Sequence, residues 1–197
     1  PHKPRVSPWI LTSTRSFLLF KHAREFLRYL RNHQWERAEN GGILLPKAGV
    51  RFNNYYEHDI NGQDMQRDYN LLTTEGMTYL LDVGFDNGSK LATWFLSIYG
   101  GNYTPTTALT AASYPATASE ITSGTEGYSE VTRPAWTIAN PASASATNVA
   151  SKAAFTIVTA SSLTIYGAAL CSESAKGAVT GNCASATKFT AARTAYN

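Results

Sequence analysis

The sequence predicts a mainly β protein, in which an antiparallel β-sandwich or jelly-roll-like domain follows a basic N-terminal arm and an α-helix. Short runs of alternating β-branched and aromatic residues predict the strands. More than half of residues 101–197 are Ala, Ser or Thr, and only 16% of the chain is charged, against roughly 25% in a typical domain. Small, uncharged side chains allow close packing of strands and loops. We divide the chain into segments 1–42, 43–90 and 91–197.

The first segment combines an extended arm with one amphipathic helix. Residues 1–12 contain three prolines, each of which fixes φ and removes a backbone donor. Apolar residues recur at spacings of three and four over residues 14–39, which predicts a helix that starts at Ser13 or Thr14 and stops at Gly41-Gly42. The apolar positions are Phe17, Leu19, Phe20, Ala23, Phe26, Leu27 and Leu30.

Positive charge is concentrated in this segment. Residues 1–52 hold ten Lys or Arg and three Glu, a net charge of +7, whereas residues 53–197 have a net charge of −4. A basic stripe runs along the predicted helix, and it either docks on DNA, lipid or an acidic protein surface or is a solvated face. Trp9 and Trp35 flank the helix, and aromatics dominate interface hot spots. The predicted contact residues are therefore Trp9, Lys21, Arg24, Arg28, Arg31 and Trp35.

The second segment predicts a broken strand, a hairpin and a short helix. Pro46 interrupts a strand over residues 43–52. Asn61-Gly62 between two Tyr-containing runs predicts a type I′ turn, because that turn needs positive φ at two positions. Thr73 or Thr74 then caps a helix that carries Met77, Leu80 and Leu81 and ends at Gly84.

The third segment predicts strands at residues 94–99, 154–158, 163–168 and 188–192, with a further strand at 131–138 that Pro134 interrupts. Residues 100–127 predict a long loop with little regular structure. Residues 159–162 join the two strands on either side of them. Trp94 and Trp136 are expected in the core.

No motif in the chain predicts catalysis. Glu57-His58-Asp59 with Asp64 and Asp68 resembles part of a calcium loop but lacks its spacing and terminal Glu, which favours a polar hairpin. Glu120, Glu126 and Glu130 are the only carboxylates that suggest a glycosidase pair, and no cleft signal accompanies them. We therefore expect a non-enzymatic protein with no cofactor and no metal site. Cys171 and Cys183 are either free thiols or a disulfide.

Several strings resemble virion proteins of tailed bacteriophages, most closely the small head-decoration, or cement, proteins. They lie at residues 69–77 with 80–81, 94–99, 128–136, 154–157 and 165–170, so the resemblance covers residues 69–193. Such proteins have a further C-terminal strand after a Gly-Asp turn. This chain stops at Asn197 without it, so either the chain is shortened or another subunit completes the sheet. The basic helix also lies outside the resemblance.

The resemblance implies a structural protein of the virion, assembled in the bacterial cytoplasm, that stabilises the capsid lattice. Its partners would be major capsid subunits and copies of itself, as a dimer or trimer. The chain has no run of 18 apolar residues, so we expect no membrane partner. Nucleic acid is not an expected partner. Two alternatives remain: a tail, baseplate or host-binding adhesin component whose loops 100–127 and 171–187 bind a glycan or protein, and a basic adaptor that touches DNA through the helix stripe.

Overall fold

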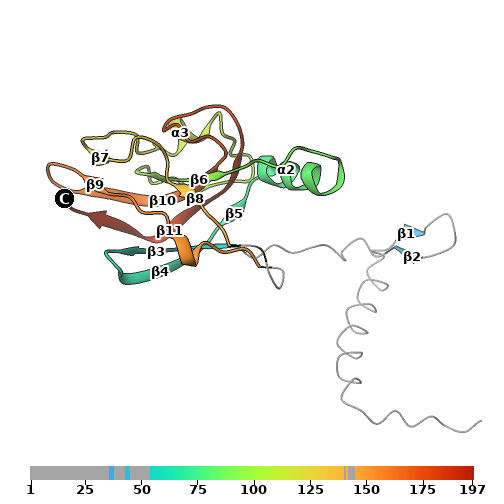
Figure 1. The fold of residues 1–197 in the computed structure, drawn as a ribbon, viewed down its shortest axis with the longest axis horizontal. Helices are drawn as coiled ribbons and strands as arrows, with labels where there is room; N and C mark the ends of the chain where they lie inside the picture. Colours follow the sequence, from blue (N-terminus) through green and yellow to red (C-terminus); the bar gives the residue numbers. More distant parts are fainter. Residues whose placement is uncertain (1–35, 38–42, 45–53, 140, 142–144) are drawn as a thin grey trace, which may run out of the picture. The chain divides into compact units, whose positions relative to one another are not determined.

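The computed structural model describes residues 36–37, 43–44, 54–139, 141 and 145–197 (Figure 1). The chain divides into two compact units, residues 1–52 and residues 53–197, and each is described by itself. Across the described residues the structure is mainly β, with antiparallel sheets and few helices. The prediction of a mainly β, antiparallel protein is confirmed at this level.

In the first unit, the described residues form one short antiparallel pair. Strand β1 (Glu36–Arg37) pairs with β2 (Ile43–Leu44), with Glu36 opposite Leu44 and Arg37 opposite Ile43. The predicted helix over residues 14–39 is therefore wrong at its C-terminal end. Residues 36–37 pair with a second strand instead of continuing a helix. The rest of that predicted helix lies outside the described residues.

The second unit is organised around a five-stranded antiparallel sheet with the strand order β5-β11-β10-β6-β8. Both predicted segments, 43–90 and 91–197, contribute to this sheet. Its edge strand β5 comes from segment 43–90, and the other four strands come from segment 91–197. The strands are β5 (Leu71–Leu72), β6 (Trp94–Tyr99), β8 (Ala135–Trp136), β10 (Leu163–Cys171) and β11 (Cys183–Ala195).

Several strand predictions hold in position but not in length or pairing. Residues 94–99 form β6 as predicted, while residues 188–192 are the middle of a 13-residue strand. The strand predicted at 154–158 is only β9 (Ile157–Val158), and it pairs with β7 (Gly127–Tyr128) rather than with β10. The strand predicted at 131–138 is reduced to β8, which pairs with β6 so that Trp136 lies opposite Trp94.

The Asn-Gly hairpin is confirmed. Strands β3 (Tyr55–Ile60) and β4 (Gln63–Tyr69) are joined by Asn61 and Gly62, whose φ angles of 53° and 75° suit a type I′ turn. The hairpin lies along β11, as Figure 1 shows. The Tyr56 hydroxyl is 2.9 Å from Ser185 Oγ on that strand.

Both faces of the five-stranded sheet are buried. The adjacent residues Ile98 and Tyr99 of β6 point to opposite faces and belong to different apolar clusters. One cluster combines Tyr99, Ala169, Cys171, Cys183 and Ala186 with Leu109, Ala111, Tyr114 and Ala118. The other combines Ile98, Ile165, Ala168 and Phe189 with Ile121 and Tyr128. Alanines in the central strands leave room for these covering segments to approach.

The covering segments are largely irregular. Residues 100–127 contain only the short helix α3 (Tyr114–Thr117) as regular structure before β7, as the sequence predicts, yet they supply much of the first core cluster. The 3₁₀ turn η1 (Val149–Ser151) lies between β8 and β9 in the chain, and none of its residues is buried. Trp94 and Trp136 are only partly buried, so the expectation that they lie in the core is wrong. The large aromatic residues that are fully buried are Tyr99, Tyr114 and Tyr128.

Helix α2 (Thr74–Phe85) begins where the sequence predicts and ends later. The Thr73 side chain accepts a hydrogen bond from Gly76 N at 2.9 Å, which is an ordinary N-cap. Gly84 does not end the helix. Asn87, with φ of 58°, and the bond from Gly88 N to Asp82 O close it instead. Among the described residues, no helix is long and apolar enough to cross a membrane.

Candidate interaction surface

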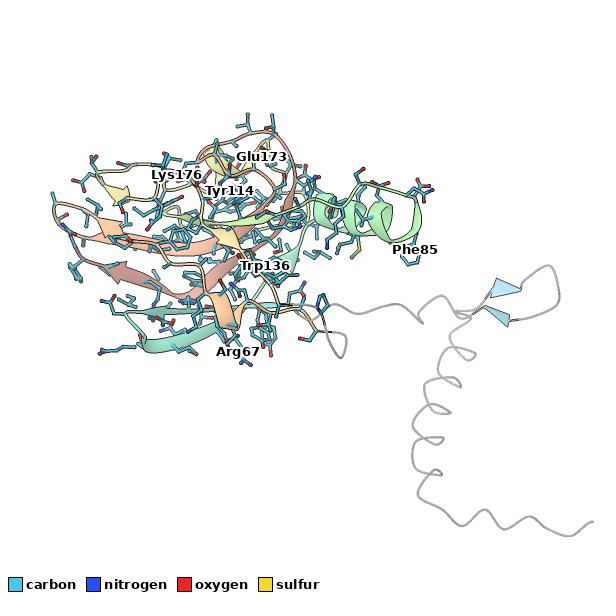
Figure 2. All side chains as sticks on the ribbon, viewed as in Figure 1. Arg67, Phe85, Tyr114, Trp136, Glu173 and Lys176 are labelled. Carbon is cyan, nitrogen blue, oxygen red and sulfur yellow. The ribbon has the colours of Figure 1, made fainter. Side chains whose placement is uncertain are left out.

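The outer face of α2 carries an exposed apolar ridge. The side chains of Met77, Leu80, Leu81 and Phe85 are 36%, 41%, 51% and 87% exposed. Met77, Leu81 and Phe85 are spaced by four, and Leu80 lies beside them, so all four share one helical face. Figure 2 shows Phe85 at the far end of α2 from the sheet. A contiguous apolar stripe on a helix is the kind of surface that docks in a partner's groove.

The opposite face of α2 fixes this orientation. Gly76 packs so closely on β11 that a Cβ atom there would lie 2.2 Å from Ala184 O. Tyr79 meets the Trp94 ring edge-on, with ring centroids 5.1 Å apart, and its hydroxyl accepts a hydrogen bond from Leu91 N. The ridge therefore cannot turn inward without breaking these contacts.

The first turn of α2 is bonded to the sheet and to the covering loop. Glu75 Oε2 accepts hydrogen bonds from Cys183 N at 2.6 Å and from Ala111 N at 2.8 Å. The Thr73 hydroxyl donates to Cys183 O. The exposed ridge is thus carried by a helix with a rigid base.

Negative charge accompanies the ridge. Helix α2 contains Glu75 and Asp82, is followed by Asp86, and has no basic residue in its last turn. The C-terminal end of a helix is itself partly negative, so two carboxylates there favour a cation nearby. An open hollow of about 500 Å³ between α2 and residues 107–110 is lined by Glu75, Tyr79 and Asp82 and by none of the ridge residues. The ridge and the carboxylates Asp82 and Asp86 suit a partner with an apolar groove bordered by Lys or Arg.

The acidic residues of the hairpin are each paired with another side chain. Asp59 accepts from Gly62 N at 2.7 Å and lies 3.2 Å from Lys152 Nζ, and these two bonds lower the pKa of Asp59. Asp64 pairs with Arg193 at 2.6 Å. In the part of the chain that the structure describes, no group of three or more His, Cys, Asp or Glu is arranged to hold a metal ion.

Asp68 is the most buried carboxylate of the hairpin. Its Oδ2 atom lies 2.8 Å from His58 Nε2, and its Oδ1 atom accepts hydrogen bonds from the backbone N and the hydroxyl of Thr190. The His58 ring stacks on Phe189, with ring centroids 3.7 Å apart. Burial acts to raise the pKa of Asp68, but the bonds from His58 and Thr190 outweigh it and lower the pKa below its ordinary value. Asp68 therefore ties the hairpin to β11.

Asp68→Asn should lower the free energy of unfolding by about 1.5–3 kcal/mol at pH 7, since hydrogen bonds to a charged group are lost. Because the folded pKa is the lower one, this stabilisation is present above about pH 4 and is lost as pH falls through the folded pKa. Urea unfolding at several pH values between 7 and 3 should give a flatter pH profile for the variant. Parallel profiles for the two proteins would contradict this role.

The three glutamates considered as glycosidase candidates all bond within the protein. Glu120 forms a buried ion pair with Arg133. Glu126 accepts from the Thr159 hydroxyl at 2.7 Å, and Glu130 accepts from Thr156 N at 3.0 Å. Each of these carboxylates joins its own loop to at least one other segment of the chain.

The contact residues that the sequence predicts, Trp9, Lys21, Arg24, Arg28, Arg31 and Trp35, lie outside the described residues. The α2 ridge was not predicted as a contact, although its signal is in the sequence. Helix α2 has two apolar faces, one with Tyr79 and Val83 and the other with Met77, Leu81 and Phe85. Packing against one sheet buries only one of these faces.

No family model, no curated protein and no solved structure matches this chain. Its role is therefore inferred from its own residues.

Proposed function

We propose that the chain is a non-enzymatic structural protein of a tailed-phage virion, which binds major capsid subunits and stabilises the capsid lattice. The observation that carries the binding role is the α2 ridge of Met77, Leu80, Leu81 and Phe85, held outward by a rigid base. The virion assignment is supported by the resemblance of strings such as residues 69–77 and 80–81, which cover the start of α2 and part of its ridge.

The occupant that fits the ridge is a groove on a capsid subunit with an apolar floor and Lys or Arg at its border. Apolar anchors at i, i+4 and i+8 fill such a groove as a helix does in other helix-in-groove complexes. Asp82 and Asp86 would meet the basic border, and complementary charge would speed association.

The finer parts of the expected architecture belong to this proposal as well. They are a jelly-roll-like sandwich, an extended basic arm and helix in residues 1–42, a dimer or trimer, and assembly in the cytoplasm of a bacterial host. The stripe of Lys21, Arg24, Arg28 and Arg31 would bind an acidic surface of a neighbouring subunit rather than nucleic acid, and Trp9 and Trp35 would anchor it.

Replacing both Leu81 and Phe85 by Asp should weaken binding to phage heads that lack this protein by at least tenfold, because two apolar anchors are lost. The matched control replaces Val131 and Val149 by Asp, since these valines are also exposed, at 91% and 61%, but are not part of α2. Co-sedimentation of the full chain with such heads measures the affinity. A separate variant with all four stripe residues changed to Gln tests the N-terminal contact.

Equal binding by the α2 variant and its control would overturn the role of the ridge. If the full chain binds tails or host cells but not heads, the protein is a tail, baseplate or adhesin component instead. Circular dichroism of each variant shows whether it remains folded. Each variant should remain folded, because all of the substituted side chains in α2 and in its control are exposed to solvent.

A further inference from the structure

The two cysteines of the chain face each other across the central sheet. Cys171 is the last residue of β10 and Cys183 is the first of β11, and they are partners in the strand register next to a β-bulge. Both are free thiols in this structure, and they are 2% and 0% exposed. Residues 172–182 form the loop between them.

The strand ladder continues one step beyond the two cysteines, since Ser172 N donates to Asn182 O at 2.8 Å on the loop side of the pair. On the other side a β-bulge lies between Leu170 and Cys171, because Leu170 is opposite Ser185 and Cys171 is opposite Cys183. Residues that are opposite each other in an antiparallel ladder have Cα atoms about 4.5–5.5 Å apart. A disulfide needs Cα atoms about 4.4–6.8 Å apart, so the backbone suits one.

The two thiols share one buried, apolar environment. A hydrogen bond with Cys171, followed by burial, raises the pKa of the Cys183 thiol. Both side chains belong to the apolar cluster that includes Tyr99, Tyr114 and Ala186. Among the described residues, the sulfurs belong to no group of three or more His, Cys, Asp or Glu that could hold a metal ion.

We propose that Cys171 and Cys183 form an oxidation site, which takes a small disulfide such as oxidised glutathione and becomes an intramolecular cross-strand disulfide. One thiolate attacks the oxidant and releases one glutathione thiol, and the second cysteine then displaces the other glutathione. The protein loses two protons and two electrons as its S–S bond forms. The oxidant gains both and leaves as two thiols.

The covalent bond would act on the base of α2. The Cys183 carbonyl accepts a hydrogen bond from the Thr73 hydroxyl, and Cys183 N donates one to Glu75. Cys183 therefore joins the first turn of α2 to β11. A disulfide would hold β10, β11 and this turn together after the protein leaves a reducing cell interior. The oxidation site itself does not depend on the docking role of α2.

Burial makes the reaction slow in the folded protein. The thiolate is the nucleophile in this reaction. The raised pKa of Cys183 keeps its thiolate form scarce, and burial shields both sulfurs from the oxidant. Oxidation therefore needs local opening of residues 172–182 or occurs during folding. Gly177 and Gly181, both with positive φ, lie in this loop.

The test uses the full chain, reduced and then refolded from urea with or without oxidised glutathione. We expect the oxidised product to be a monomer lighter by two hydrogens, with a peptide that joins Cys171 to Cys183 and no thiol left for maleimide. Its equilibrium constant for unfolding should be about a hundredfold smaller than that of the reduced chain, as closure of a loop of this length predicts. Native protein should oxidise far more slowly than refolding protein.

Cys171→Ala and Cys183→Ala are matched controls, because each removes one sulfur and leaves a side chain common in this core. Each should keep its remaining thiol or carry one glutathione, and should gain no stability from the oxidant. Refolded wild type that keeps two free thiols, joins two chains through its cysteines, or is destabilised by the bond would overturn the proposal.

Discussion

Replacing Glu120 by Ala should lower the free energy of unfolding by about 3–5 kcal/mol, a large part of the stability of an ordinary domain. Glu120 and Arg133 form a bidentate pair, with Nε–Oε1 and Nη2–Oε2 distances of 2.7 Å. Both side chains are almost completely buried. Without the carboxylate, a guanidinium stays buried with one remaining acceptor, Glu173 O, and the ring of Tyr114.

Glu120 also accepts hydrogen bonds from two other parts of the chain. The Ser97 hydroxyl on β6 donates to it at 2.8 Å, and Gly177 N donates at 3.0 Å. Tyr114 joins the network through its bond to Ser97. The variant therefore leaves several buried donors without a partner, and each one adds a desolvation cost.

Urea unfolding of the full chain, followed by circular dichroism, measures this effect. The control is Glu57→Ala, which removes the exposed pair with Arg67 and should cost at most about 1 kcal/mol. The double variant Glu120→Leu with Arg133→Met should be more stable than Glu120→Ala, because no charge is left buried. A cost for Glu120→Ala as small as that for Glu57→Ala would show that the buried pair contributes little.

Local signals explain what the sequence predicted correctly. Three correct predictions depend on the backbone preferences of a few neighbouring residues. They are the Asn61-Gly62 turn, the Thr73 cap and the strand over residues 94–99. The helix over residues 14–39 was wrong at residues 36–37 because a strand pairing with residues 43–44 replaces helical bonds there. The periodicity of apolar residues alone does not reveal that a strand pairing competes with the helix.

Pairings between distant residues could not be predicted in the same way. Strand β9 pairs with β7 and not with its neighbour in sequence, β10. The ion pair of Glu120 and Arg133 depends on how irregular segments of the chain fold. The candidate interaction surface depends on such a contact too. The face of α2 that stays exposed is decided by Gly76 against Ala184, and no property of residues 74–85 alone distinguishes the two apolar faces.

That contact supplies the second large effect. Gly76→Ala should destabilise the protein by about 3 kcal/mol, because the new Cβ would lie 2.2 Å from Ala184 O and 2.6 Å from Ala184 Cα, both backbone atoms that cannot swing aside. Gly84→Ala is the matched control on the same helix. A Cβ there meets nothing within 4 Å, so Ala should stabilise the protein by about 0.5–1 kcal/mol through helix propensity.

The opposite signs of the two substitutions separate packing from propensity. Both replace Gly by Ala inside α2, so their intrinsic effect on the helix is the same and only the contact with β11 differs. Urea unfolding gives the free energies, and binding to phage heads gives the consequence for the ridge. If α2 must be seated on Ala184 to present Leu81 and Phe85, Gly76→Ala weakens binding while Gly84→Ala keeps it. Stabilisation by both substitutions would mean that α2 is not held against β11, and the ridge would then have no fixed direction.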